Sequence, residues 1–66
     1  MARDRYGATP LHLAANEGQI DLVELLVARG ANVDARDNRG ATAAAIARLK
    51  GHLDIVELLQ RHVSHE

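Results

Sequence analysis

This chain of 66 residues carries a formal net charge of −1, which provides no overall field to attract nucleic acid or an anionic membrane surface. The absence of cysteine excludes disulfides, thiolate metal sites and cysteine nucleophiles, and it is typical of a reducing compartment. Because no apolar run approaches the ~20 residues of a membrane-spanning helix and no apolar signal-peptide core follows Met1, we expect an intracellular protein, cytoplasmic or nuclear.

The first predicted helix covers residues 10–17. Thr9 precedes it as an N-cap whose hydroxyl accepts a first-turn amide, and Pro10 occupies the first helical position, where a missing N–H costs nothing. Gly18 ends this helix, and a second helix follows over residues 20–29, with aliphatic side chains on more than one face. Gly30 ends the second helix, and residues 31–39 form a loop.

The same plan returns 33 residues later. Aligning residues 2–30 with 35–63 gives 13 identities in 29 positions, including the segment Val-Glu-Leu-Leu at 23–26 and 56–59. Helices are therefore predicted over residues 43–49 and 53–62, with Thr42 in the place of Thr9. A period near 33 built from a turn and two helices indicates a helical repeat.

The residues that carry a family resemblance are Thr-Pro-Leu-His-Leu-Ala at 9–14, which match the T-P-L-H-x-A pattern of the ankyrin repeat. The chain therefore resembles that family, and the resemblance implies an all-α solenoid of two helix-turn-helix repeats, over residues 1–33 and 34–66. It also implies that residues around 37–40 form the tip of a hairpin-like finger between the repeats. His12 and His52 are then structural, with His12 hydrogen-bonded to the threonine of the motif and to the adjoining loop.

The second repeat resembles a C-terminal capping repeat. Polar residues replace apolar ones where a further repeat would stack: Arg48 for Ala15, Gln60 for Val27 and Arg61 for Ala28. No comparable cap precedes the first repeat. We therefore interpret the chain as the C-terminal part of a longer array, and we expect an open apolar face on repeat one that promotes self-association, drawn from Leu11, Leu13, Leu22, Leu25 and Val27.

Catalytic and metal-binding chemistry is not predicted. The threonines at the helix starts act as caps, and the carboxylates on the second helices belong to a solvated face. Metal sites need several convergent ligands, and His62 and His65 have no third ligand beside them. We expect no enzyme activity, no cofactor and no metal.

Basic residues gather near the finger tips, at Arg3, Arg5, Arg36 and Arg39, but Asp4, Asp34 and Asp37 nearly cancel their charge. Because no aromatic residues are interleaved with these basic residues to stack bases, nucleic acid is not expected as a partner. An acidic protein segment is the more natural partner for such a row of basic residues.

The resemblance implies a non-catalytic protein-interaction module that binds through finger tips and first helices. Tyr6, Arg39 and Leu49 are the candidate anchors, because hot spots favour Tyr and Arg and an aliphatic side chain stands out on a polar face. For Leu49, the alternative is that it covers the end of its own helix. The alternative is a designed or excised minimal repeat unit with a purely structural role and no partner. The full set of candidate contact residues is Arg5, Tyr6, Ala8, Asn16, Glu17, Asn38, Arg39, Ala41, Leu49 and Lys50.

Overall fold

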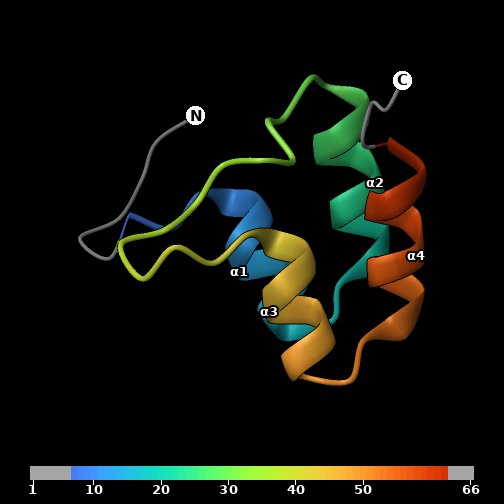
Figure 1. Ribbon diagram of the computed structural model, residues 1–66. Helices are drawn as coiled ribbons and strands as arrows, with labels where there is room; N and C mark the ends of the chain where they lie inside the picture. The colour runs from blue at the N-terminus through green and yellow to red at the C-terminus, as the bar shows by residue number, and fades with distance from the viewer. Residues whose placement is uncertain (1–6, 63–66) are drawn as a thin grey trace.

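The computed structural model describes residues 7–62, which form four α-helices: α1 (Pro10–Glu17), α2 (Ile20–Ala28), α3 (Ala43–Leu49) and α4 (Leu53–His62). Helices α1 and α2 make the first helix pair, and α3 and α4 make the second. The pairs stack so that α1 lies beside α3 and α2 lies beside α4 (Figure 1). The described residues contain no strand, so the predicted all-α fold is confirmed. The second helix ends one residue earlier than expected, with Arg29 as its C-cap.

Threonine starts the first helix of each pair, as predicted. The Thr9 side chain accepts from the His12 backbone N–H, and the Thr9 backbone N–H donates to the His12 ring, which closes a capping box. Thr42 accepts from the Ala45 N–H at 3.2 Å, but an alanine at this third position has no side chain to return the bond. The start of α1 is therefore held by more interactions than the start of α3.

Helices α1, α2 and α3 each end at a glycine, and the residue after that glycine donates its backbone N–H to the carbonyl four residues before the glycine. After α1, the Gln19 N–H donates to the Ala14 carbonyl at 3.0 Å, and Gly18 has a φ of 75°. This left-handed conformation costs a residue with a Cβ about 1–2 kcal/mol. Gly18 is constrained a second time, because a Cβ there would lie 2.7 Å from Cε1 of His52. The His52 ring therefore packs closely over the end of α1 and joins the two pairs, which agrees with its predicted structural role.

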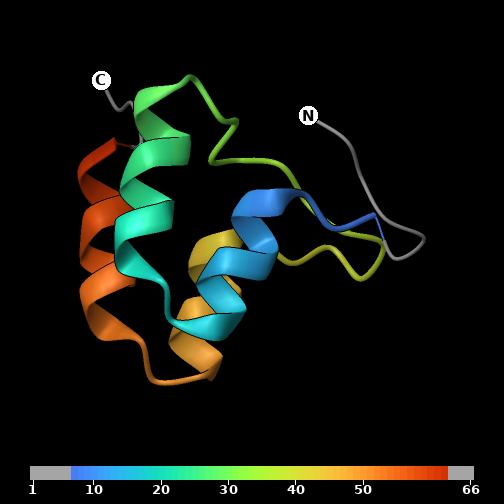
Figure 2. The same ribbon diagram turned by 180° about the vertical axis from the view of Figure 1, so that it is seen from behind.

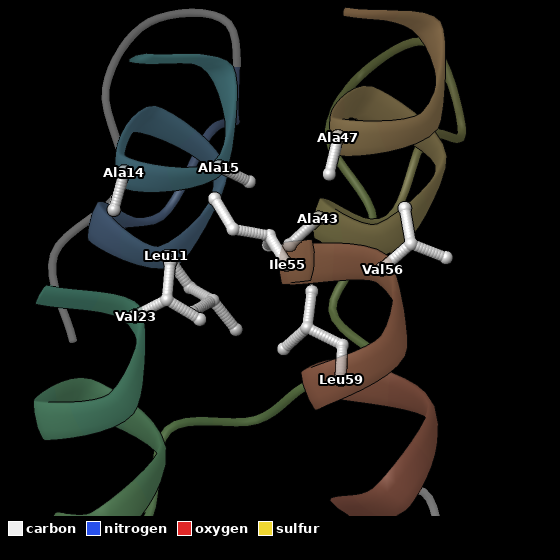
Figure 3. Close-up of a cluster of buried hydrophobic side chains, with 9 residues drawn as sticks. All are labelled: Leu11, Ala14, Ala15, Val23, Ala43, Ala47, Ile55, Val56 and Leu59. Atoms are coloured by element: carbon white, nitrogen blue, oxygen red, sulfur yellow. The ribbon is translucent and has the colours of Figure 1, made fainter. Parts of the chain in front are cut away.

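The core fills the space between the four helices (Figure 3). Alanines on α1 and α3 let these helices approach closely, and larger aliphatic side chains from all but α3 occupy the centre. Leu11 is 1% exposed and belongs to this core, so the apolar face expected to remain open on the first pair does not include it. The core residues are Leu11, Ala14, Ala15, Val23, Ala43, Ala47, Ile55, Val56 and Leu59.

The predicted finger is present between α2 and α3. Its tip is a three-residue hairpin loop: the Asp37 N–H donates to the Ala41 carbonyl at 3.0 Å, and the Gly40 N–H donates to the Asp37 carbonyl at 2.9 Å. Gly40 supplies the positive φ of 82° that this loop requires. In both views the loop leaves α2, extends past the start of α1 and returns to α3 (Figures 1 and 2).

Candidate functional site

A hollow of about 340 Å³ lies where α1, α3 and the finger meet. Its volume falls near the lower end of the roughly 300–1,000 Å³ typical of ligand sites. Residues from all three segments and from the stretch before α1 contribute to it. They are Ala8, His12, Leu13, Asn16, Asp37, Arg39, Ile46, Leu49 and Lys50.

The apolar part of the hollow comes from three aliphatic side chains. Leu13 on α1 and Ile46 on α3 occupy equivalent positions of the two pairs, and Leu49 lies at the end of α3. Leu13 is 48% exposed and Leu49 is 83% exposed, whereas Ile46 is half-buried. The hollow therefore presents aliphatic surface that the fold itself leaves uncovered.

Among residues 7–62, two exposed cations and one carboxylate line the hollow. Arg39 comes from the finger tip and Lys50 directly follows α3. Asp37 is already engaged, because its Oδ1 accepts the backbone N–H groups of Arg39 and Ala41, each at 2.9 Å. The Ala41 hydrogen bond, helped by the N–H and the guanidinium of Arg39, lowers the pKa of Asp37, while partial desolvation opposes this effect. Asp37 is therefore an anionic anchor for the finger tip.

His12 lies in the wall of the hollow and links the two pairs. Its Nδ1 accepts the Thr9 backbone N–H at 3.0 Å and lies 2.8 Å from the Thr9 hydroxyl. Because Nδ1 is an acceptor, the ring hydrogen is on Nε2, which donates to the Ala41 carbonyl at 2.8 Å. The side chain is 2% exposed and both ring nitrogens are used, so the structural role predicted for His12 is confirmed.

The structure places the predicted contact residues in three groups. Ala8, Asn16, Arg39, Leu49 and Lys50 line the hollow. Glu17, Asn38 and Ala41 do not: Glu17 is exposed at the end of α1, Asn38 lies against the backbone of Gly7, and the Ala41 carbonyl accepts from His12. Arg5 and Tyr6 lie outside the described residues.

Sequence reasoning missed four residues that line the hollow: Leu13, Ile46, Asp37 and His12. A signal for the first two was available, because an aliphatic residue recurs at the same position of both first helices. Asp37 also carries a signal, since aspartate at the start of a turn commonly accepts a hydrogen bond from a backbone amide two residues on.

Residues 7–62 contain neither a cluster of metal ligands nor a membrane-spanning helix. Three or more histidine, aspartate or glutamate side chains gather nowhere in this segment in a way that would hold a metal ion. Each of its helices is also too short or too polar to cross a membrane.

Stacked helix pairs, each opened by threonine and joined by a hairpin finger, define the class of helical solenoid repeat proteins. The family model for ankyrin repeats, which describes three copies, matches residues 1–65, and the chain belongs to the ankyrin repeat family. Members of this family generally act as protein-interaction modules and are typically non-enzymatic. A stretch of 33 residues, half of the chain, is 52% identical to delta-latroinsectotoxin-Lt1a of Latrodectus tredecimguttatus, but it spans only 3% of that protein.

Proposed function

We propose that this chain is a non-catalytic module that binds a partner protein at the hollow between α1, α3 and the finger. The observation that carries this proposal is the combination of exposed Leu13 and Leu49 with the cations Arg39 and Lys50 in one concavity. An aliphatic side chain that loses its water on binding contributes about 1.5–3 kcal/mol when it becomes fully buried. Leu49 is more exposed than Leu13, so it buries more apolar surface when a partner binds.

The frame around the hollow is well fixed. The finger tip is held by Asp37 and by the His12 bond to Ala41, and the two first helices share the alanine-rich contact of the core. A prearranged surface loses little conformational freedom on binding, which favours affinity. The proposal therefore assigns recognition to side chains that project from a rigid scaffold.

The test is selection of a displayed library of random linear peptides on the immobilised chain. The selected peptides should lose binding to a Leu49→Ser/Lys50→Gln variant. The matched control is Leu53→Ser/Arg48→Gln, because Leu53 is 65% exposed and both positions lie outside the hollow. Peptides that bind both variants equally, or a selection that yields no specific binder, would refute the proposed function.

We also propose that the second pair is the last repeat of a longer array. Ala15 is fully buried and Val27 is half-buried against the core, whereas their counterparts Arg48 and Gln60 are exposed. Arg61 adds nothing to this comparison, because its counterpart Ala28 is exposed as well. His12 supplies a further argument. It holds the finger that follows its own pair, and the second pair has Ala45 in that position.

The side of the first pair that faces away from the second pair carries exposed apolar residues, which favours a preceding repeat or self-association. Ile55 and Leu59 are 0% and 1% exposed where the second pair packs on the first, whereas their counterparts Leu22 and Leu26 are 38% exposed and half-buried. Leu25, at 48% exposure, extends this surface. An apolar face that its own fold does not cover attracts another surface.

Self-association is tested by light scattering on the eluting protein over a dilution series. A Leu22→Gln/Leu25→Gln variant should shift the equilibrium to monomer, and a Leu53→Gln control should not. A wild-type chain that remains a cooperatively melting monomer at micromolar concentration would contradict this part of the proposal. The repeat boundaries at 33 and 34, the lack of any cofactor and an intracellular location stay predictions from the sequence.

A further inference from the structure

We propose that the hollow recognises an acidic segment of its partner, in which carboxylates flank one aliphatic side chain. This inference rests on the proposed function and names the chemistry of the partner. Each part of the segment has a counterpart on the described residues: Arg39 and Lys50 for the carboxylates, and the aliphatic surface for the apolar side chain.

The charges of the hollow favour an anionic partner. The ion pair found among residues 7–62 joins Glu57 to Arg61 on α4, away from the hollow, so it engages neither of the hollow's cations. The one carboxylate that residues 7–62 contribute to the lining, Asp37, already accepts two backbone amides through Oδ1. The two cations that line the hollow come from different elements: Arg39 from the finger tip and Lys50 from the end of α3.

The apolar part of the hollow favours an aliphatic anchor. It consists of Leu13, Ile46 and Leu49, and residues 7–62 contribute no Phe, Tyr or Trp side chain to the lining. Single-stranded nucleic acids gain much of their binding energy by stacking bases on aromatic rings, which the described part of this surface does not supply. Two cations beside aliphatic surface therefore suit a protein carboxylate and a neighbouring leucine-like side chain better than a phosphate backbone with bases.

The experiment measures fluorescence anisotropy of a short labelled peptide in which glutamates flank a single leucine. Comparison peptides carry serine for the leucine, glutamine for the glutamates, or lysine for the glutamates. The glutamate-leucine peptide should bind most tightly, the serine and glutamine peptides more weakly, and the lysine peptide least. Binding should also weaken as salt is raised, because exposed ion pairs are screened.

Variants of the chain locate the binding. Arg39→Gln and Lys50→Gln should each raise the Kd by roughly two- to fivefold, the range for one exposed ion pair. Leu49→Ser should raise it by about tenfold through lost apolar burial. The controls Arg48→Gln and Leu53→Ser, which lie outside the lining, should leave the Kd unchanged. Circular dichroism of each variant checks that these exposed substitutions leave the helices intact.

Three results would overturn the inference: glutamine or lysine peptides that bind as tightly as glutamate peptides, loss of binding confined to the control variants, or an oligouridylate that binds tighter than the acidic peptide at the same residues. These outcomes differ from failure of the proposed function. If selected peptides depend on Leu49 and Lys50 but prove basic or aromatic, the hollow is a protein-binding site and only its assigned chemistry is wrong.

Discussion

The His12 side chain offers the sharpest test of how the two helix pairs are held together. In His12→Ala, the buried Thr9 N–H loses its acceptor, and the Ala41 carbonyl loses one of its two donors but keeps the Asp37 N–H. The unpaired Thr9 N–H costs about 1–3 kcal/mol and the lost bond to Ala41 about 0.5–1.5 kcal/mol, so we expect a loss of about 3 kcal/mol in the free energy of unfolding. At roughly 0.05–0.15 kcal/mol per residue, a chain of 66 residues has about 3–10 kcal/mol in total. The substitution therefore removes a large part of the stability.

The assay is urea denaturation followed by far-UV circular dichroism at fixed chain concentration. Thr42→Ala is the matched control, because it removes only one cap bond of 3.2 Å and should cost about 1 kcal/mol or less. His12→Asn keeps an acceptor near the position of Nδ1 but cannot reach Ala41, so it should fall between the two. Amide exchange at Gly40 should also accelerate in His12→Ala as the finger loosens. Equal losses for His12→Ala and Thr42→Ala would refute the reasoning.

Three further predictions follow from the glycines, the finger and the histidines. Gly51→Ala should lower the free energy of unfolding by about 1 kcal/mol, because its backbone is left-handed. Gly18→Ala should lower it clearly more, because the added Cβ also meets the His52 ring. Combining Gly18→Ala with His52→Ala should remove this additional loss, as measured by urea denaturation. Since hydrogen bonding lowers the pKa of Asp37 below its ordinary 3.8, its charge adds stability that is present above that pH and lost as pH falls through the lowered value. The stability advantage of the wild type over Asp37→Asn should therefore shrink in acid, and an advantage independent of pH would contradict this. Zinc or a chelator should leave thermal unfolding unchanged, because residues 7–62 bring no three metal ligands together; tight one-to-one zinc binding by calorimetry would show otherwise.

The fold could be predicted because the starts and ends of its helices depend on local chemistry. Thr9 and Pro10 define a helix start through chemistry that depends only on neighbouring residues, and Gly18 defines an end in the same way. The period of 33 then places the second pair without any knowledge of long-range contacts. Local chemistry does not reveal which aliphatic residue faces which neighbour. For that reason Leu11 was expected on the open face, whereas the structure places it in the core.

The candidate site could be predicted only in part. Arg39 and Lys50 were predicted because the resemblance to ankyrin repeats assigns partner contacts to finger tips and first helices, and both residues line the hollow. Leu13 and Ile46 were missed, because a helix that is apolar on several faces does not reveal which face is left for a partner. Asn38 was expected to contact a partner, but its position depends on the backbone of Gly7, which approaches only after the finger has folded against the first pair.

The hollow is a product of repeat stacking. Its residues come from α1, from α3 and from the finger between the pairs, so it exists only when the two pairs are docked. His12 connects these requirements, since it caps α1, holds the finger through Ala41 and lies in the wall of the hollow. A partner that binds only this docked arrangement stabilises it by RT ln(1 + [L]/Kd), where [L] is the partner concentration. Binding and stacking are therefore linked, because a partner at the hollow reinforces the contact between pairs that a chain of this size has few other residues to support.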